Sequence, residues 1–271
     1  MKRSFTLFFF SFFITGSFAG NEDQAYGARS AALGNASVTL ADPWSVFNNQ
    51  AGLGFVKKAG IGICYEDRFL MKELGIKSFA FALPVKGGTF GLSCSSFGYS
   101  AYGENKYGLG FGKAFGENIS AGVQMDYLQT RISEGYGTKG SLVAEAGLQF
   151  RLLKNLTIGT HLYNITRTKL ADYNAEKIPT VMRIGLNYKF SEKVFIAIES
   201  EKNMDQKVVF RAGAEYMVAK ILYLRAGIAS NPSLSSFGIG LHYKGLKLEI
   251  TSTFHPVLGM SPQVGLGYDL K

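Results

Sequence analysis

The stretch Tyr107-Gly-Leu-Gly-Phe-Gly112 places a large apolar side chain at every second position, with glycine between. The stretch Phe237-Gly-Ile-Gly-Leu-His-Tyr243 shows the same alternation near the other end of the chain. A period of two is typical of a β-strand whose two faces meet different surroundings. Between residues 59 and 270 there are about fourteen such strand-length segments, joined by turns that alternate short and long. This pattern predicts an all-β fold, a transmembrane antiparallel up-and-down β-barrel that is apolar outside and polar or small inside.

The turns predict which end of the barrel faces outward. Short connections such as 116–118 and 244–245 are expected at the periplasmic end, and longer ones such as 98–105 and 255–262 at the outer end. An unbroken series of hairpins gives an even number of strands and places both termini at the periplasmic end. Fourteen strands fit the whole pattern, and twelve would follow if two weak segments are not strands.

The first nineteen residues are typical of a secretory signal peptide. Lys2 and Arg3 form a charged start, a Phe-rich apolar stretch follows, and small residues precede a cleavage position after Ala19. The residue after this position is Gly20 rather than Cys, which argues against a lipid-anchored start. An uncleaved membrane helix is the alternative, but the apolar stretch is short for one. With the barrel pattern, this predicts a bacterial outer-membrane protein with segments 1–19, 20–58 and 59–271.

Composition and charge narrow the class of protein further. The chain is 46% hydrophobic and 14% aromatic, which a barrel explains because alternation dilutes an apolar face without removing it. The formal net charge is +9, and many bases lie at or beside the short turns. Such a basic rim would face lipid headgroups, including lipopolysaccharide, or an acidic protein partner. The sequence lacks a basic groove with interleaved aromatic residues, which is the feature that would suggest nucleic acid binding.

Side-chain parity assigns the two faces of each strand. On the fifth segment, Ile119, Val123, Met125 and Tyr127 are expected to face lipid. A base on the lipid face near the midplane would cost about 2–4 kcal/mol. Nearly all mid-strand charges fall on the opposite, lumenal parity, and we expect them to form a network of ion pairs: Asp126, Glu145, Arg183, Glu199, Arg211, Glu215, Arg225 and Glu249.

Two pairs in this charge network are expected from hairpin neighbours. Arg211 can reach Glu199 across one hairpin, and Glu215 can reach Arg225 across the next. A cluster of charges that binds a substrate is the alternative to a purely structural network.

Glycines form a second group with lumenal parity, on the first, twelfth and fourteenth segments. We call them the glycine seam: Gly60, Gly62, Gly238, Gly240, Gly265 and Gly267. The first and last strands must pair to close the barrel, and a wall without side chains leaves room for another backbone to approach. The N-terminal segment, which is joined to the first strand, is the expected neighbour.

Residues 20–58 do not show the barrel pattern. Small residues dominate, together with the only Trp of the chain and an Asn-Asn-Gln cluster. This composition predicts a compact plug in the lumen, and a periplasmic tail is the alternative. The residues expected to hold the plug are Arg29, Trp44, Phe47, Asn48, Asn49 and Gln50.

The same segment resembles the start of the PorV/PorQ-type outer-membrane proteins of Bacteroidota, which are related to the FadL-type fatty-acid channels. The matching residues are Gly27-Ala28-Arg29, the run from Gly34 to Val38, Asp42, Phe47 and Asn49-Gln-Ala-Gly-Leu53. Gln50 stands where the family usually has Pro. The resemblance implies a fourteen-stranded barrel. It also implies two functions, because FadL-type proteins pass hydrophobic molecules through a plugged barrel, whereas PorV-type proteins are partners of a secretion machinery.

Nothing in the sequence indicates an enzyme or a bound cofactor. His161 and His242 have lumenal parity and His255 falls in an outer loop, and no spacing ties them to a nucleophile or to metal ligands. Cys64 and Cys94 lie within strand segments and are expected to be free thiols, although the sequence leaves a bond between them open.

Two functional hypotheses remain. The first is an accessory or adaptor subunit of an outer-membrane secretion or assembly complex, with other outer-membrane or periplasmic proteins as partners. Short loops, a charge-filled lumen and a basic rim favour it. The alternative is a FadL-like transporter of hydrophobic small molecules. It needs an apolar path, whereas the inward rows are expected to be mainly Gly, Ser, Thr and charged residues.

Overall fold

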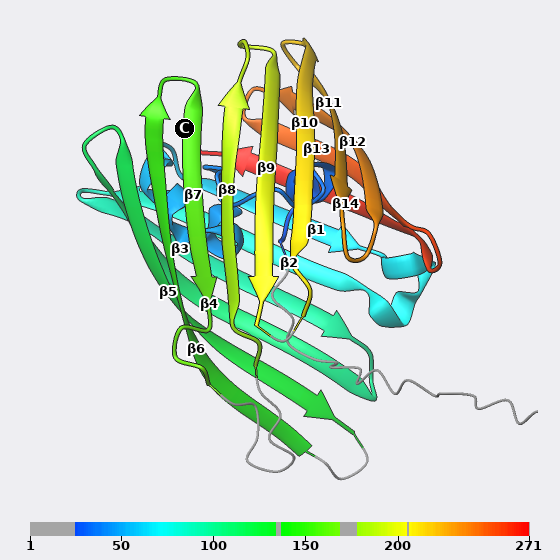
Figure 1. The fold of residues 1–271 in the computed structure, drawn as a ribbon. Coiled ribbons are helices and arrows are strands. Elements are labelled where there is room, and N and C mark those ends of the chain that lie inside the picture. The colour runs from blue at the N-terminus through cyan, green and yellow to red at the C-terminus, as the bar shows by residue number, and fades with distance from the viewer. Residues whose placement is uncertain (1–24, 134–136, 169–177, 205, 271) are drawn as a thin grey trace, which may run out of the picture.

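A computed structural model describes residues 25–133, 137–168, 178–204 and 206–270. The predicted signal peptide, and the first residues of the predicted 20–58 segment, lie outside the described residues. Fourteen antiparallel strands form a closed barrel in which each strand pairs with its neighbours in sequence and β1 pairs with β14 (Figure 1). The predicted fold class is therefore confirmed, with fourteen strands rather than twelve.

The barrel contains strands of very different lengths, the longest of which are β4, β5 and β6. The strands are β1 (Gly60–Glu66), β2 (Ile76–Val85), β3 (Gly88–Gly98), β4 (Tyr102–Phe115), β5 (Ile119–Ile132), β6 (Gly137–Leu153), β7 (Leu156–Tyr163), β8 (Val181–Lys189), β9 (Val194–Asn203), β10 (Val209–Ala219), β11 (Leu222–Ala229), β12 (Leu234–Tyr243), β13 (Leu246–His255) and β14 (Gly259–Asp269). Two short 3-10 helices, η2 (Arg68–Leu70) and η3 (Lys72–Leu74), lie between β1 and β2.

Two of the expected long outer loops are wrong. The connection from β3 to β4 is residues 99–101 instead of 98–105, because β4 continues outward to Tyr102 by pairing with the end of β5 at Ile132. The connection from β13 to β14 is residues 256–258 instead of 255–262, because β14 begins at Gly259. The polar residues at the ends of these strands have the composition of a loop, but pairing with the neighbouring strand satisfies their backbone hydrogen-bonding groups.

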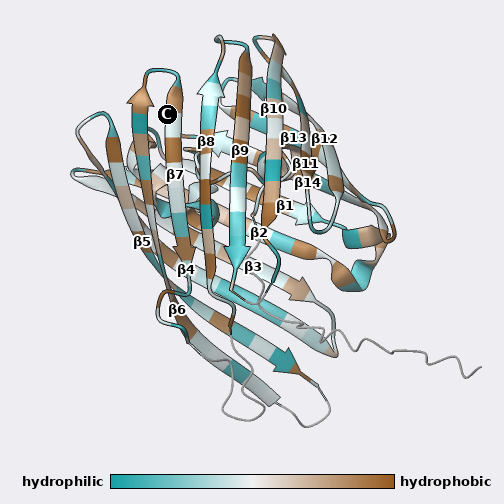
Figure 2. Cartoon of the chain, in the orientation of Figure 1, coloured by the Kyte–Doolittle hydropathy of each residue, from teal (hydrophilic) through white to brown (hydrophobic). Residues whose placement is uncertain are grey.

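The outer and inner faces alternate along each strand. Val123 and Met125 are each 59% exposed on the outer face, whereas Gln124 between them is 4% exposed. The same alternation of hydrophobic and hydrophilic residues is visible along the strands in Figure 2. The outer rows are thus apolar, as expected for a wall in contact with lipid. In the described part of the chain, no helix is long and apolar enough to cross a membrane.

Residues 25–56, which we call the inner segment, lie within the barrel (Figure 1, blue). The segment contains α1 (Ala28–Ala32), α2 (Ser45–Asn48) and the 3-10 helix η1 (Gln50–Phe55). Phe47 and Leu53 are fully buried and pack with Ala80 and Ala82 of β2, while Leu33 packs near Phe195 of β9. The inner segment therefore shares its apolar core with the wall of the barrel.

Glycine in the wall allows the backbone of the inner segment to approach. A Cβ at Gly122 of β5 would lie 2.3 Å from the carbonyl carbon of Gln50, and one at Gly112 of β4 would lie 2.4 Å from the Gln50 carbonyl oxygen. Both distances are shorter than van der Waals contact, so larger residues at these positions would displace the segment. Ser120 of β5 adds a hydrogen bond, its Oγ donating to the Ala51 carbonyl oxygen at 2.6 Å.

Candidate functional site

Ion pairs cross the lumenal face of β8, β9 and β10. Arg183 Nε lies 3.0 Å from Glu201 Oε2, and Arg211 Nη1 lies 2.6 Å from the same oxygen and 3.3 Å from Glu199 Oε1. The second Glu199 oxygen accepts hydrogen bonds from the backbone N–H groups of Ser37 and Val38, each at 2.8 Å. The expected neighbour pair of Arg211 and Glu199 is present, and the pair also anchors the inner segment.

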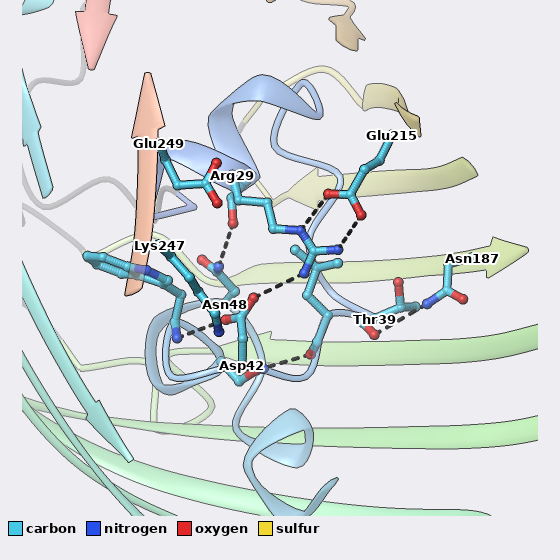
Figure 3. Close-up of polar contacts among 12 residues, drawn as sticks. Arg29, Thr39, Asp42, Asn48, Asn187, Glu215, Lys247 and Glu249 are labelled. Carbon is cyan, nitrogen blue, oxygen red and sulfur yellow. Dashed lines mark hydrogen bonds and ion pairs between the residues drawn. The ribbon is translucent and has the colours of Figure 1, made fainter. Parts of the chain in front are cut away.

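A second chain of charges joins the inner segment to β10, β11, β12 and β13. Arg29 makes two hydrogen bonds to Glu215, with Nε 2.8 Å from Oε2 and Nη2 2.9 Å from Oε1 (Figure 3). Arg225 Nε donates to Glu215 Oε2 at 2.6 Å, and its other nitrogens bond to Glu249. His242 Nε2 lies 2.6 Å from Glu249 Oε1. One continuous network therefore runs from the inner segment across the four strands β10 to β13.

A third cluster surrounds Glu145 on β6. This carboxylate lies 2.6 Å from Lys106 Nζ, 2.9 Å from His161 Nε2 and 2.6 Å from Gln50 Nε2. Asp126 is 3.3 Å from the same ammonium. Sequence reasoning did not name Lys106 as a site residue, although it shares the lumenal parity of the glycines that follow it on β4. The three clusters together contain all eight residues of the predicted charge network.

The Asn-Asn-Gln cluster fixes the inner segment by its amide groups. Asn48 accepts from the Tyr26 backbone N–H at 2.9 Å and donates to the Tyr26 carbonyl oxygen at 3.1 Å. Asn49 Nδ2 donates to the Val38 carbonyl oxygen at 2.7 Å and to the Thr160 carbonyl oxygen of β7 at 3.2 Å. Gln50 reaches the wall through Glu145. These amides therefore join different parts of the inner segment to one another and also bind the segment to the strands.

The aromatic residues of the inner segment stack beside these amides. The ring of Phe47 lies 4.2 Å from that of Tyr26 and 6.1 Å from that of Trp44, measured between centroids. Trp44 in turn lies against the wall at Gly62 of β1. All six predicted plug residues are therefore within the barrel.

Most of the glycine seam faces the inner segment. A Cβ would meet Pro43 from Gly60, Trp44 from Gly62, Ala32 from Gly238 and Ala28 from Gly265, at 2.6–3.2 Å. The other two glycines face wall residues instead: Gly240 lies against Arg225 and Glu249, and Gly267 against Ile61 and Lys247. The seam is thus a surface of close approach at four of its six positions.

Beyond the inner segment, on the side of the outer loops, is a cavity of about 280 Å³ that we call the vestibule. Its wall mixes charged and apolar side chains, among them Arg68, Phe69, Val181, Glu201 and Arg211. Asn35 of the inner segment also lines it. On its inner side the vestibule is therefore bounded by the inner segment at Asn35 and by the Arg211–Glu201 ion pair.

An apolar cluster faces the lumen beside the vestibule. It consists of Leu128, Val143, Tyr163, Ile178 and Val181, each at most 3% exposed. The expectation that the inward rows hold mainly Gly, Ser, Thr and charge is wrong here, on β5 to β8. The sequence did not reveal this cluster because each of the four strands contributes one residue, Ile178 precedes β8, and the five residues adjoin only in the folded barrel.

The two cysteines form no disulfide, and no metal-binding group is found in the described part of the chain. Cys64 and Cys94 are free thiols, the first on the lumenal face of β1 and the second on the outer face of β3. Within the described ranges, no group of three His, Cys, Asp or Glu side chains could hold a metal ion.

Several solved structures share this fold. The toluene transporter TbuX of Ralstonia pickettii superimposes with a TM-score of 0.73 at 11% identity, covering 92% of this chain and 99% of that one. The toluene transporter TodX of P. putida gives 0.69 at 13% identity over 92% and 99% of the two chains. A FadL homologue of Pseudomonas aeruginosa gives 0.65 at 12% identity over 95% and 100%. The chain therefore has the barrel fold of FadL-type outer-membrane channels.

No protein-family model and no curated protein matches the sequence.

Proposed function

We propose that this protein is an outer-membrane channel for small, largely apolar molecules, which enter at the vestibule and pass when the inner segment moves. The observation that carries the proposal is the position of the inner segment: it closes the lumen of a FadL-like barrel beneath a cavity that is partly apolar. The inner segment also resembles the start of the PorV/PorQ-type proteins, which are related to the FadL-type channels, and this supports a FadL-like function.

The size and lining of the vestibule suit a small ligand. Its volume of about 280 Å³ is at the lower end of the range of about 300–1,000 Å³ for ligand pockets. A cavity of roughly 150 Å³ already accepts benzene. Val181 belongs both to the vestibule and to the apolar cluster behind it, so an apolar molecule would find favourable contacts beyond the charged mouth.

An open diffusion pore fits the interior poorly. Arg183, Glu145, Glu199 and His161 are at most 1% exposed, and Gln50 of the inner segment, which donates to Glu145, is fully buried. Buried charges that are paired and hydrogen-bonded resist removal of either partner. Passage therefore requires a rearrangement of the inner segment rather than a standing aqueous path.

Uptake measurements test the proposal. Cells that lack other hydrocarbon channels, with and without this protein, are given radiolabelled toluene, and we expect faster uptake with it. Val181→Gln places a polar side chain at the join of vestibule and apolar cluster and should slow uptake. Met182→Leu changes the neighbouring outward-facing residue and should leave it unchanged. Equal uptake with and without the protein contradicts the proposal.

A second candidate function is an accessory subunit of an outer-membrane secretion or assembly complex. The short outer connections 99–101 and 256–258 and the filled lumen favour it, because they leave the outer wall and the rims as working surfaces. Affinity purification in mild detergent separates the two functions. Stoichiometric outer-membrane or periplasmic partners, without any effect on toluene uptake, would support the accessory role over transport.

A further inference from the structure

The outer wall of the barrel carries a groove of about 530 Å³ across β14, β1, β2, β3 and β4. Its sides are large apolar residues that face lipid: Ile63, Tyr65, Phe79, Tyr107, Val264 and Leu266. Its floor lies at Cys94 and Ser96 of β3, whose small side chains leave a hollow between Phe79 and Tyr107. The groove is outside the barrel and is thus separate from the vestibule.

A row of polar residues crosses one end of this groove. Strand register places Lys77 of β2 beside Ser96 of β3, Ser96 beside Asn105 of β4, and Asn105 beside Gln129 of β5. All four belong to outward-facing rows. Asn105 Nδ2 donates to Gln129 Oε1 at 3.2 Å. Four hydrogen-bonding side chains in register on a lipid-facing wall are unusual, because lipid chains offer them no partners.

Lys77 brings an uncompensated positive charge to the row. It is exposed and forms no ion pair with any described residue. The outward rows of β1 to β5 contain no Asp or Glu, whereas Arg131 of β5 adds a second exposed cation close to the same strand ends. Lys77 is the second residue of β2, near the outer connection between β1 and β2. An anionic group at the outer leaflet would match this charge.

We propose that the groove binds one molecule of lipopolysaccharide, with an acyl chain of its lipid A between Phe79 and Tyr107 and a phosphate at Lys77. The apolar sides accept a hydrocarbon chain, and Ser96 and Asn105 donate hydrogen bonds to headgroup oxygens. Lysine binds phosphate as a point charge, which requires no fixed orientation. The outer end of the strands, where the row lies, faces the leaflet that contains lipopolysaccharide.

Native mass spectrometry tests this site on the full-length protein. Protein purified in neutral detergent is incubated with rough lipopolysaccharide or, in parallel, with phosphatidylglycerol, and the retained lipid is counted. We expect lipopolysaccharide to be retained preferentially. Lys77→Gln should weaken retention roughly fivefold, the effect of one base near an anionic surface. Cys94→Leu and Ser96→Leu fill the floor and should weaken it at least as much.

Matched controls lie on the same lipid-facing wall. Lys113→Gln removes an outward lysine at the opposite end of β4, and Ala226→Leu introduces the same leucine side chain as Cys94→Leu on the outer face of β11. Both should retain lipopolysaccharide as the wild type does. Heat-dependent mobility on a detergent gel verifies that each variant forms the barrel.

Three results would overturn the proposal. Lipopolysaccharide retention could be unchanged in Lys77→Gln and both filling variants. Phosphatidylglycerol could be retained as well as or better than lipopolysaccharide. Finally, Cys94→Leu could abolish toluene uptake while lipid retention stays at the wild-type level, which would assign the groove to the transported molecule.

Discussion

The guanidinium of Arg29 makes two hydrogen bonds to the carboxylate of Glu215, at 2.8 and 2.9 Å, across a sequence separation of 186 residues. Arg29 belongs to the inner segment and Glu215 to β10, so this pair fastens the inner segment to the wall of the barrel. Arg29 also lies 3.5 Å from Asp42, which links two parts of the segment (Figure 3). Because it joins the inner segment to the wall, Arg29 is the residue at which the proposed movement of the segment can be tested most directly.

Replacing Arg29 by Gln should loosen the inner segment. Charge-assisted hydrogen bonds contribute about 1.5–3 kcal/mol, and we expect the lower part of this range because the Arg29 side chain is 28% exposed. Protease cleavage within residues 25–56 should become faster, and conductance across planar bilayers should rise. Arg29→Lys should give an intermediate cleavage rate and conductance, because it keeps the charge but not the bidentate geometry. Cleavage and conductance identical to wild type would refute this role.

Gly122→Val should displace the inner segment without breaking the barrel. The new Cβ would lie 2.3 Å from the Gln50 carbonyl carbon, a distance that Cβ atoms do not adopt. Conductance should rise while heat-dependent gel mobility is kept. Ala121→Val on the outward row is the matched control and should behave as wild type. An unchanged conductance for Gly122→Val would mean that the segment does not occlude the lumen.

Lys106→Met should destabilise the barrel strongly. It leaves Asp126 and Glu145, both with fully buried side chains, without the ammonium that lies between them. Breaking a buried ion pair in this way costs about 3–5 kcal/mol. The double variant Lys106→Met with Glu145→Gln should recover part of the loss, as measured by urea unfolding in lipid vesicles. The same unfolding midpoint for wild type and Lys106→Met would rule out a structural role for the cluster.

Val123→Arg tests the orientation of the wall. A base on the lipid face near the midplane should cost about 2–4 kcal/mol, falling to about 0–1 kcal/mol near the interface. Ile119→Arg, on the same outward row at the end of β5, should therefore be tolerated. Refolding into vesicles at graded urea concentrations gives both values. Equal costs at the two positions would contradict the placement of Val123 within the membrane.

The sequence predicted those features that follow from strand parity and hairpin register. Val123 and Gln124 alternate in exposure because neighbouring side chains must point to opposite faces. Arg211 and Glu199 meet because they are opposite each other on adjacent strands. The contact of Arg29 with Glu215 obeys no such rule, since periodicity says nothing about where an irregular segment lies in a lumen. The groove around Cys94 likewise requires the register of several strands at once.

The central claim is that small apolar molecules pass only when the inner segment moves, and a reversible tether tests it most directly. Ala28 lies close to Gly265, with 3.2 Å between the Ala28 Cβ and the position of a Cβ at Gly265, near the separation of about 3.5–4.5 Å in disulfides. The tether is the pair Ala28→Cys and Gly265→Cys in a background of Cys64→Ser and Cys94→Ser. We predict that oxidation lowers toluene uptake to that of cells without the protein and that reduction restores it. Equal uptake in the oxidised and reduced states would contradict the claim.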